Sequence, residues 1–261
     1  MAAITTQIYR LCVPTSPMRA APDSDAECTN ECLFGEWLQA DIQSHNPTPT
    51  QWQLVTARRD GYKGFVNKTH LQPVENKAEQ PTHWVSSRST LIFKSASIKS
   101  CVIHRLPFLS QLDAPEEADN GFRKVSDGGY IWKQHLLEIG TTMNIRALEL
   151  ARAYFLGSPY LWGGNTEQGL DCSGLVQVLA NAKGMHMPRD SVDQENALKN
   201  TIAFEQRRSG DLVYWPGHTG ILVDPDTLLH ATAHSLSCVI EPLVNVNARA
   251  GEISSIKRLF D

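Results

Sequence analysis

The sequence has no apolar run that approaches the roughly 18 consecutive residues required for a membrane helix. It also has no excess of positive charge, because 24 Lys and Arg against 28 Asp and Glu give a formal net charge of −4. Binding of nucleic acid or anionic lipid through overall charge is therefore excluded. The start, MAAITTQIYRLCVP, lacks the charged and then apolar pattern of a signal peptide, so we expect a cytoplasmic protein with neither nucleic acid nor membrane as a partner.

The six cysteines are few and irregularly spaced for a chain of 261 residues. A chain of this length can bury a sizeable core, so disulfides are not needed to hold it together. Cys28 and Cys32 have the spacing of half a zinc site, but no second pair matches them. We expect neither a bound metal nor another cofactor.

Two similar segments indicate a repeated module in the first half of the chain. They are DGYKGFVNKTHL from Asp60 and DGGYIWKQHL from Asp127, each following short β-rich stretches broken by turn residues. We interpret residues 1–75 and 82–140 as two small β-barrels. The polar run PVENKAEQPT, residues 73–82, has the composition of a linker between them.

Residues 141–261 have a different sequence pattern, which predicts helices first and strands after them. Apolar residues at Ile145, Leu148, Ala151 and Phe155 predict a helix that stops at Gly157. Further helices are predicted from Cys172 to Gly184 and from Asp190 or Ser191 onward. After Gly210, short β-branched runs separated by Pro-Gly, Asp-Pro-Asp and Asn-rich turns predict antiparallel strands, which gives an α+β domain.

Cys172 is placed where a glycine-rich loop, SPYLWGGNTEQGLD, becomes a helix. Unpaired N–H groups and the helix dipole favour negative charge there, so we expect the pKa of this thiol to be lowered and the sulfur to act as a nucleophile. A cysteine can also be a small core residue.

Two histidines, His218 in PGHTGILV and His230 in LLHATA, lie on predicted strands on either side of the Asp224-Pro225-Asp226 turn. If the strands form a hairpin, one imidazole can act as base for the thiol while the other orients it. The register of the turn is left open by the sequence, and a slip of one residue would reverse one side chain. Taken singly, each histidine could be a buried polar group with a satisfied hydrogen bond.

The motifs PYLWGG, DCSG, GDLVYW, GHTGILV and LLHA, in this order and spacing, resemble the NlpC family of papain-like cysteine peptidases over residues 141–261. The resemblance implies that Cys172 is the nucleophile, that His218 is the general base and that His230 orients it. It also implies an active-site role for Tyr160, whose alternative role is core packing. By the same resemblance, the two β modules are bacterial SH3-like domains.

Two such modules before the peptidase are similar to intracellular γ-D-glutamyl-L-diamino acid endopeptidases, which recycle muropeptides that have a free N-terminal L-alanine. A free ammonium requires a carboxylate and hydrogen-bond acceptors. The resemblance implies a substrate-binding set of Asp190, Ser191, Trp162, Asp171, Tyr62 and Glu36. Asp190 and Ser191 could instead be helix caps, and Glu36 a solvated surface acid.

The implied reaction is attack by the sulfur on the amide between the γ-carboxyl of D-glutamate and the diamino acid, without a metal. One alternative is an exported or injected hydrolase of polymeric peptidoglycan. Another is a non-catalytic peptide-binding protein with tandem SH3-like modules, although its expected mark would be a lost nucleophile or base. Papain-fold lipid acyltransferases fit less well, because their resemblance places the histidine before the cysteine.

Overall fold

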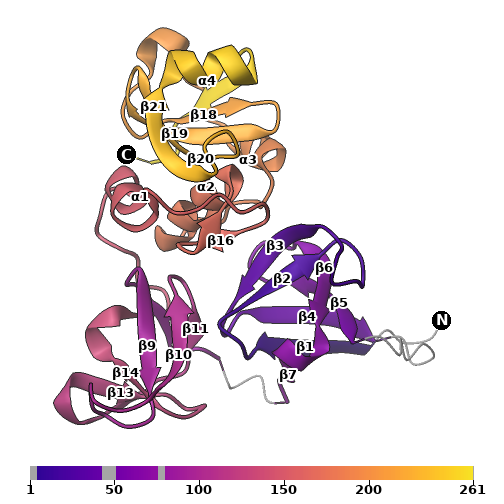
Figure 1. Ribbon diagram of the computed structural model, residues 1–261, viewed down its shortest axis with the longest axis vertical. Helices are drawn as coiled ribbons and strands as arrows, with labels where there is room; N and C mark the ends of the chain where they lie inside the picture. Colours follow the sequence, from indigo (N-terminus) through magenta and orange to yellow (C-terminus); the bar gives the residue numbers. More distant parts are fainter. Residues whose placement is uncertain (1–4, 43–50, 76–79, 261) are drawn as a thin grey trace. The chain divides into compact units, whose positions relative to one another are not determined.

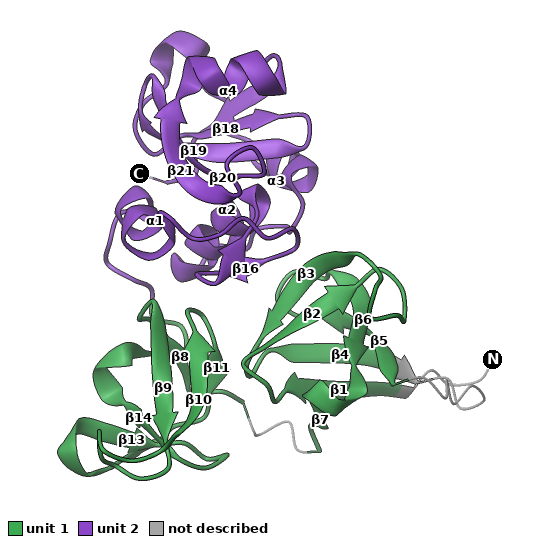
Figure 2. Ribbon diagram, viewed as in Figure 1, with its two compact units in different colours: residues 1–141 green, residues 142–261 purple. Residues whose placement is uncertain are grey.

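The computed structural model describes residues 5–42, 51–75 and 80–260, which form two compact units, 1–141 and 142–261 (Figures 1 and 2). Part of the predicted linker, residues 76–79, lies outside the described residues. No helix in the described ranges is both long enough and apolar enough to cross a membrane.

The first unit contains only strands and short 3-10 helices among its described residues. Its first sheet has the strand order β3-β2-β6-β5-β4-β1-β7. The strands are β1 Thr5–Leu11, β2 Thr15–Arg19, β3 Cys28–Leu33, β4 Trp37–Ile42, β5 Trp52–Ala57, β6 Lys63–Asn67 and β7 Leu71–Pro73, with η1 Lys68–His70 between the last two.

The rest of the first unit forms two smaller sheets, β10-β9-β14-β13-β12 and β11-β8-β15. Their elements are β8 His83–Val85, β9 Ser89–Phe93, β10 Val102–Pro107, β11 Gln111–Leu112, β12 Glu116–Glu117, η2 Asp119–Gly121, β13 Phe122–Lys124, β14 Tyr130–Trp132, η3 Lys133–His135 and β15 Leu136–Glu138.

The two segments that look alike in sequence also fold alike. Each runs from a strand through one 3-10 turn into a short strand, as β6-η1-β7 and as β14-η3-β15. The histidine that ends each 3-10 turn has the same partner type, since Nδ1 of His70 lies 2.8 Å from the Ser16 hydroxyl and Nδ1 of His135 lies 2.8 Å from the Thr90 hydroxyl. The same local chemistry therefore closes both turns.

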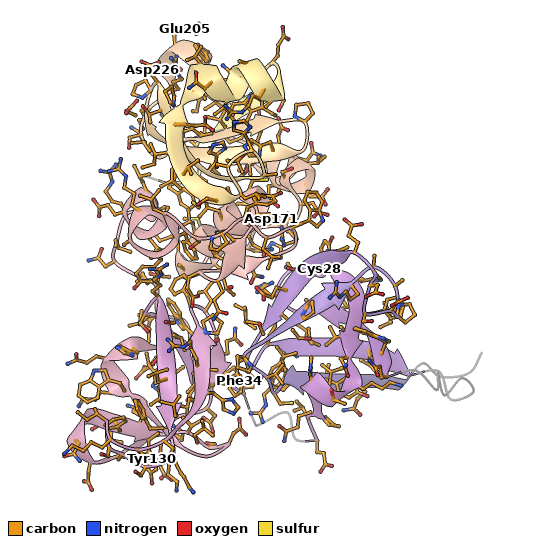
Figure 3. All side chains as sticks on the ribbon, in the orientation of Figure 1. Cys28, Phe34, Tyr130, Asp171, Glu205 and Asp226 are labelled. Atoms are coloured by element: carbon orange, nitrogen blue, oxygen red, sulfur yellow. The ribbon has the colours of Figure 1, made fainter. Side chains whose placement is uncertain are left out.

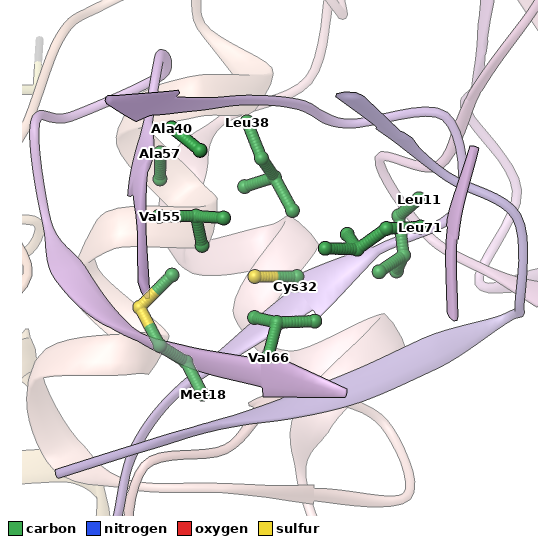
Figure 4. Close-up of a cluster of buried hydrophobic side chains, with 9 residues drawn as sticks. All are labelled: Leu11, Met18, Cys32, Leu38, Ala40, Val55, Ala57, Val66 and Leu71. Carbon is green, nitrogen blue, oxygen red and sulfur yellow. The ribbon is translucent and has the colours of Figure 1, made fainter. Parts of the chain in front are cut away.

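Apolar residues that alternate along the strands of the first sheet meet in one core (Figure 4). This cluster consists of Leu11, Met18, Cys32, Leu38, Ala40, Val55, Ala57, Val66 and Leu71. A separate cluster fills the space between the two smaller sheets, with Val85, Ile92, Leu106 and Leu112 among its members.

The second unit is built around a five-stranded antiparallel sheet of order β21-β20-β19-β18-β22. Its strands are β18 Leu212–Trp215, β19 His218–Asp224, β20 Thr227–Thr232, β21 Ser237–Pro242 and β22 Ser255–Lys257, and the short pair β16 Asn165–Thr166 and β17 Gly169–Leu170 precedes α2. The helices are α1 Ala147–Phe155, α2 Cys172–Ala182, α3 Ser191–Ala197, η4 Phe204–Gln206 and α4 Leu243–Ala250. The sheet lies between α4 and the pair α1 and α2 (Figure 1).

The three predicted helices and the predicted strands of the second unit are present, but one prediction is wrong. The Asn-rich segment after Pro242, which we expected to be a turn, is the helix α4. Its Leu243 and Val246 are three residues apart and pack on Leu222 and Leu228 of the sheet. Burial of this stripe outweighs the weak helix propensity of the two asparagines.

Candidate active site

Cys172 is the first residue of α2, and Asp171, which is labelled in Figure 3, is its N-cap. One carboxylate oxygen of Asp171 accepts the N–H of Gly174 at 2.7 Å, and the other accepts the N–H of Gly163 at 2.9 Å. The same carboxylate binds the guanidinium of Arg189, with distances of 3.0 and 2.6 Å. Asp171 thus joins the glycine-rich loop, the start of α2 and the segment before α3.

Arg189 is a component that the sequence did not single out, although it directly precedes Asp190. It is only 3% exposed, and besides Asp171 it binds the Ser173 hydroxyl at 2.8 Å. Gln194 of α3 donates to the Ser173 carbonyl at 2.9 Å, so a second bond ties this segment to the first turn of α2. Asp190 and Ser191 lie between these two anchors.

The thiol of Cys172 is buried, at 7% exposure. Burial and the nearby Asp171 charge raise its pKa to about 11, although the N–H groups of Thr219 and Ser173 donate to the sulfur and oppose the shift. The expectation that the helix start lowers this pKa is therefore wrong. The hydrogen bond from Thr219 places the sulfur at the start of β19, because Thr219 directly follows His218, the first residue of that strand.

The two predicted histidines are neighbours, so the structure settles the register that the sequence left open. β19 and β20 form a hairpin in which Asp224 pairs with Thr227. Nε2 of His218 lies 2.7 Å from Nδ1 of His230. Burial, together with His230, lowers the pKa of His218 to about 4, so its imidazole is neutral at pH 7 and can accept a proton.

Gly220 makes room for this pair. A Cβ at Gly220 would lie 2.9 Å from Cβ of His230 and 2.8 Å from a methyl group of Leu228. These separations are below normal contact distances, so only a glycine at position 220 leaves room for the Leu228 and His230 side chains of β20. The second glycine of the GHTG motif, Gly220, is therefore required for steric reasons.

Behind His230 lie two charged residues that the sequence did not single out. Nε2 of His230 is 2.8 Å from a carboxylate oxygen of Glu241 in β21, and Arg249 of α4 binds the same oxygen. Strand alternation could have found Glu241, because Glu241 and Val239 share a face and Val239 pairs with His230. Nothing in the sequence pattern indicated Arg249.

The remaining predicted site residues occupy varied positions. Tyr160 is half-buried, and burial raises its pKa to about 12, with the nearby Cys172 adding to the shift. Trp162 is 57% exposed on the glycine-rich loop. Asp190 is exposed at the N-cap position of α3 but makes no capping bond through its side chain, and Ser191 is buried.

Glu36 and Tyr62 belong to the first unit. Glu36 is 5% exposed, so its interpretation as a solvated surface acid is wrong. It accepts the N–H of Leu33 at 3.1 Å, and Arg59 lies 3.6 Å from it. Tyr62 is half-buried and packs against the core of the first sheet.

Residues 157–248, which include the cysteine and both histidines, match the NlpC/P60 family. The chain carries an NlpC/P60 domain. It is 27% identical to the gamma-D-glutamyl-L-lysine dipeptidyl-peptidase of Bacillus subtilis over 87% of this chain and 76% of that protein. It is 25% identical to dipeptidyl-peptidase 6 of Lysinibacillus sphaericus over 82% of this chain and 83% of that protein.

An NlpC/P60 family protein from Bacillus cereus has the same fold, with a TM-score of 0.81 at 18% identity, over 97% of this chain and 100% of that one. The second unit therefore has the papain-like fold of the NlpC/P60 family, with mixed helix and strand content. The chain is a cysteine peptidase.

We predict that Gly174→Ala destabilises this NlpC/P60 domain by about 1–3 kcal/mol despite the better helix propensity of alanine. A Cβ at this position would lie 2.3 Å from the carbonyl oxygen of Gly164, which also accepts from Asp171 and Arg189. Urea unfolding would measure the loss. A variant as stable as the wild type would show that the loop can move away from α2 without cost.

The raised pKa of Cys172 predicts slow alkylation at neutral pH. Two pH units above an ordinary thiol correspond to about 100-fold less thiolate, so iodoacetamide should react with Cys172 about 100-fold more slowly than with N-acetylcysteine at pH 7. The rate should keep rising toward pH 11. Mass spectrometry of the Cys172 peptide separates this reaction from that of exposed Cys101. A rate plateau already reached at pH 6 would instead reveal a preformed thiolate–imidazolium pair.

Proposed function

We propose that this peptidase cleaves the bond between the γ-carboxyl of D-glutamate and the diamino acid in muropeptides with a free N-terminal L-alanine, as part of cell-wall peptide recycling. The observation that carries the proposal is the buried Cys172 thiol at the start of α2. Its sulfur accepts the N–H of Thr219, the residue after His218, and His218 is itself paired with His230. The Bacillus subtilis relative is a gamma-D-glutamyl-L-lysine dipeptidyl-peptidase, which supports this bond as the target.

The neutral resting thiol and imidazole define the first step. His218 takes the thiol proton as the sulfur attacks the amide carbonyl, so the charged pair forms only as the reaction begins. The N–H of Cys172, at the first position of α2, has no acceptor within the helix and can donate to the oxyanion. The Tyr160 hydroxyl stays protonated, because its pKa is raised, and is a second candidate donor.

The intermediate then collapses to a thioester. The C–N bond breaks, the protonated His218 gives its proton to the leaving amine, and the diamino acid departs. Water, activated by neutral His218, hydrolyses the thioester, which releases L-Ala-D-Glu and returns the proton to the sulfur. No step requires a group outside the chain, the substrate and water.

Recognition of the free amine is assigned to the segment tied to the start of α2. Asp190 is exposed and lies between Arg189, which binds Asp171, and Gln194, which binds the Ser173 carbonyl. A carboxylate held in this way next to the nucleophile's helix is a suitable partner for an ammonium. Ser191 and Trp162 remain predicted substrate contacts from the same unit, whereas the carboxylate of Asp171 is already occupied within the protein.

Glu36 and Tyr62 remain predicted substrate residues as well. Glu36 lines a cavity of about 360 Å³ in the first unit, and its Oε1 has no hydrogen-bond partner among the described residues. A carboxylate in the wall of a cavity is a suitable partner for a donor group of the substrate. We also propose that residues 1–75 and 82–140 are SH3-like domains, which the shared strand, 3-10 turn and strand arrangement supports.

We expect Cys172→Ala to abolish release of L-Ala-D-Glu from L-Ala-γ-D-Glu-L-Lys, because only the nucleophile is lost. Chromatography of the products measures release, and an unchanged thermal melt shows that the fold is retained. Product formation at the wild-type rate would refute a cysteine mechanism. A wild-type enzyme that leaves the tripeptide intact but cuts polymeric peptidoglycan would support the wall-hydrolase alternative.

Acetylation of the alanine amine should reduce kcat/KM about tenfold or more, since it removes a charged hydrogen bond. Asp190→Asn should cause a similar loss on the free tripeptide and little further loss on the acetylated one. Asp193→Asn, an exposed aspartate in the first turn of the same helix, is the matched control and should leave both rates unchanged. Equal rates on free and acetylated peptide would overturn the assignment of the amine site.

A further inference from the structure

Beyond the paired histidines, the second unit contains a continuous chain of hydrogen-bonding groups that crosses three strands and a helix. It runs from His218 in β19 to His230 in β20, to Glu241 in β21 and to Arg249 in α4. The first two spacings are 2.7 and 2.8 Å. Each link joins side chains from different elements, so the chain exists only in the folded sheet.

The chemistry of the groups fixes where the protons lie. Hydrogen bonds from Arg249 and His230 lower the pKa of Glu241 although partial burial opposes them, so Glu241 is a carboxylate that can only accept. Nε2 of His230, which faces it, must therefore carry a proton. Burial lowers the pKa of His230, so this imidazole is neutral and its Nδ1 is an acceptor.

The same reasoning extends to the base. Because Nδ1 of His230 accepts, Nε2 of His218 must be the donor, and the neutral His218 then has its lone pair on Nδ1. The Trp215 ring packs beside this imidazole, with its centroid 5.7 Å from that of His218. The nitrogen that takes the thiol proton is thereby specified as Nδ1.

We propose that Glu241 is a positioning residue for catalysis, which sets the tautomer of His230 and, through it, that of the general base His218. Arg249 contributes by holding the carboxylate oxygen that His230 needs. His230 alone would not suffice, since a neutral imidazole without a fixed partner exchanges between two tautomers, only one of which can accept from His218. In this assignment Glu241 acts on the reaction only through His230.

The test compares two substitutions at one position. In Glu241→Gln the amide oxygen can still accept from His230, and Arg249 favours the rotamer that presents this oxygen. In Glu241→Leu no acceptor remains. The control is Glu205→Leu, which removes an exposed glutamate of the same unit (Figure 3).

The first readout is the long-range ¹H–¹⁵N spectrum of the histidine side chains in the full chain, which reports the tautomer directly and requires no substrate. We expect the wild type, Glu241→Gln and Glu205→Leu to show His230 and His218 protonated at Nε2. Glu241→Leu should show mixed tautomers at His230. A wild-type spectrum with the His230 proton on Nδ1 overturns the proposal, even if the leucine variant fails to fold.

The second readout is kinetic and rests on the proposed function. With L-Ala-γ-D-Glu-L-Lys, Glu241→Leu should lower kcat about tenfold or more with KM little changed, and Glu241→Gln should recover most of the loss. A folded Glu241→Leu variant with wild-type kcat and wild-type tautomers overturns the proposal. If no enzyme form cleaves the tripeptide, the proposed substrate fails, while the spectra still decide the role of Glu241.

Discussion

The buried ion pair between Asp171 and Arg189 is the interaction on which the rest of the catalytic domain depends. Asp171 caps α2, accepts from the glycine-rich loop and binds Arg189, so the loop, the start of α2 and the segment before α3 meet at one carboxylate. Loss of either partner would leave a charge buried without compensation, at a cost of about 3–5 kcal/mol. Cys172 is the next residue, so the position of the nucleophile follows from this pair.

The same burial that fixes Cys172 also determines its protonation. The start of a helix stabilises a negative charge by about 0.3–1 kcal/mol, whereas a rise of about two pH units in pKa corresponds to roughly 3 kcal/mol against the thiolate. Desolvation therefore outweighs the helix dipole. His218 is neutral for the same reason. Before substrate binds, the sulfur is therefore protonated and the imidazole has a free lone pair.

Local features of the second unit could be predicted from the sequence, and features that depend on tertiary contacts could not. The hairpin follows from the Asp224-Pro225-Asp226 turn, and α2 follows from the helical pattern that runs from Cys172 to Gly184. The helix α4 was missed because its stability comes from packing on the sheet. Strand alternation places Glu241 on the face of Val239, but its meeting with His230 also requires the register of β20 and β21. Arg249 reaches the Glu241 carboxylate only once α4 packs on the sheet, and no spacing along the chain expresses that contact.

The order of groups behind the base has an electrostatic logic. A carboxylate in direct contact with His218 would place a second negative charge near the sulfur and oppose formation of the thiolate. A neutral imidazole in that position orients His218 without adding charge. The carboxylate of Glu241 lies one imidazole further away, where its side chain is 17% exposed, against 1% for His230, and where Arg249 compensates it. This series of hydrogen-bonded side chains thus orients the base, and the negative charge of Glu241 lies where solvent and the Arg249 guanidinium can stabilise it.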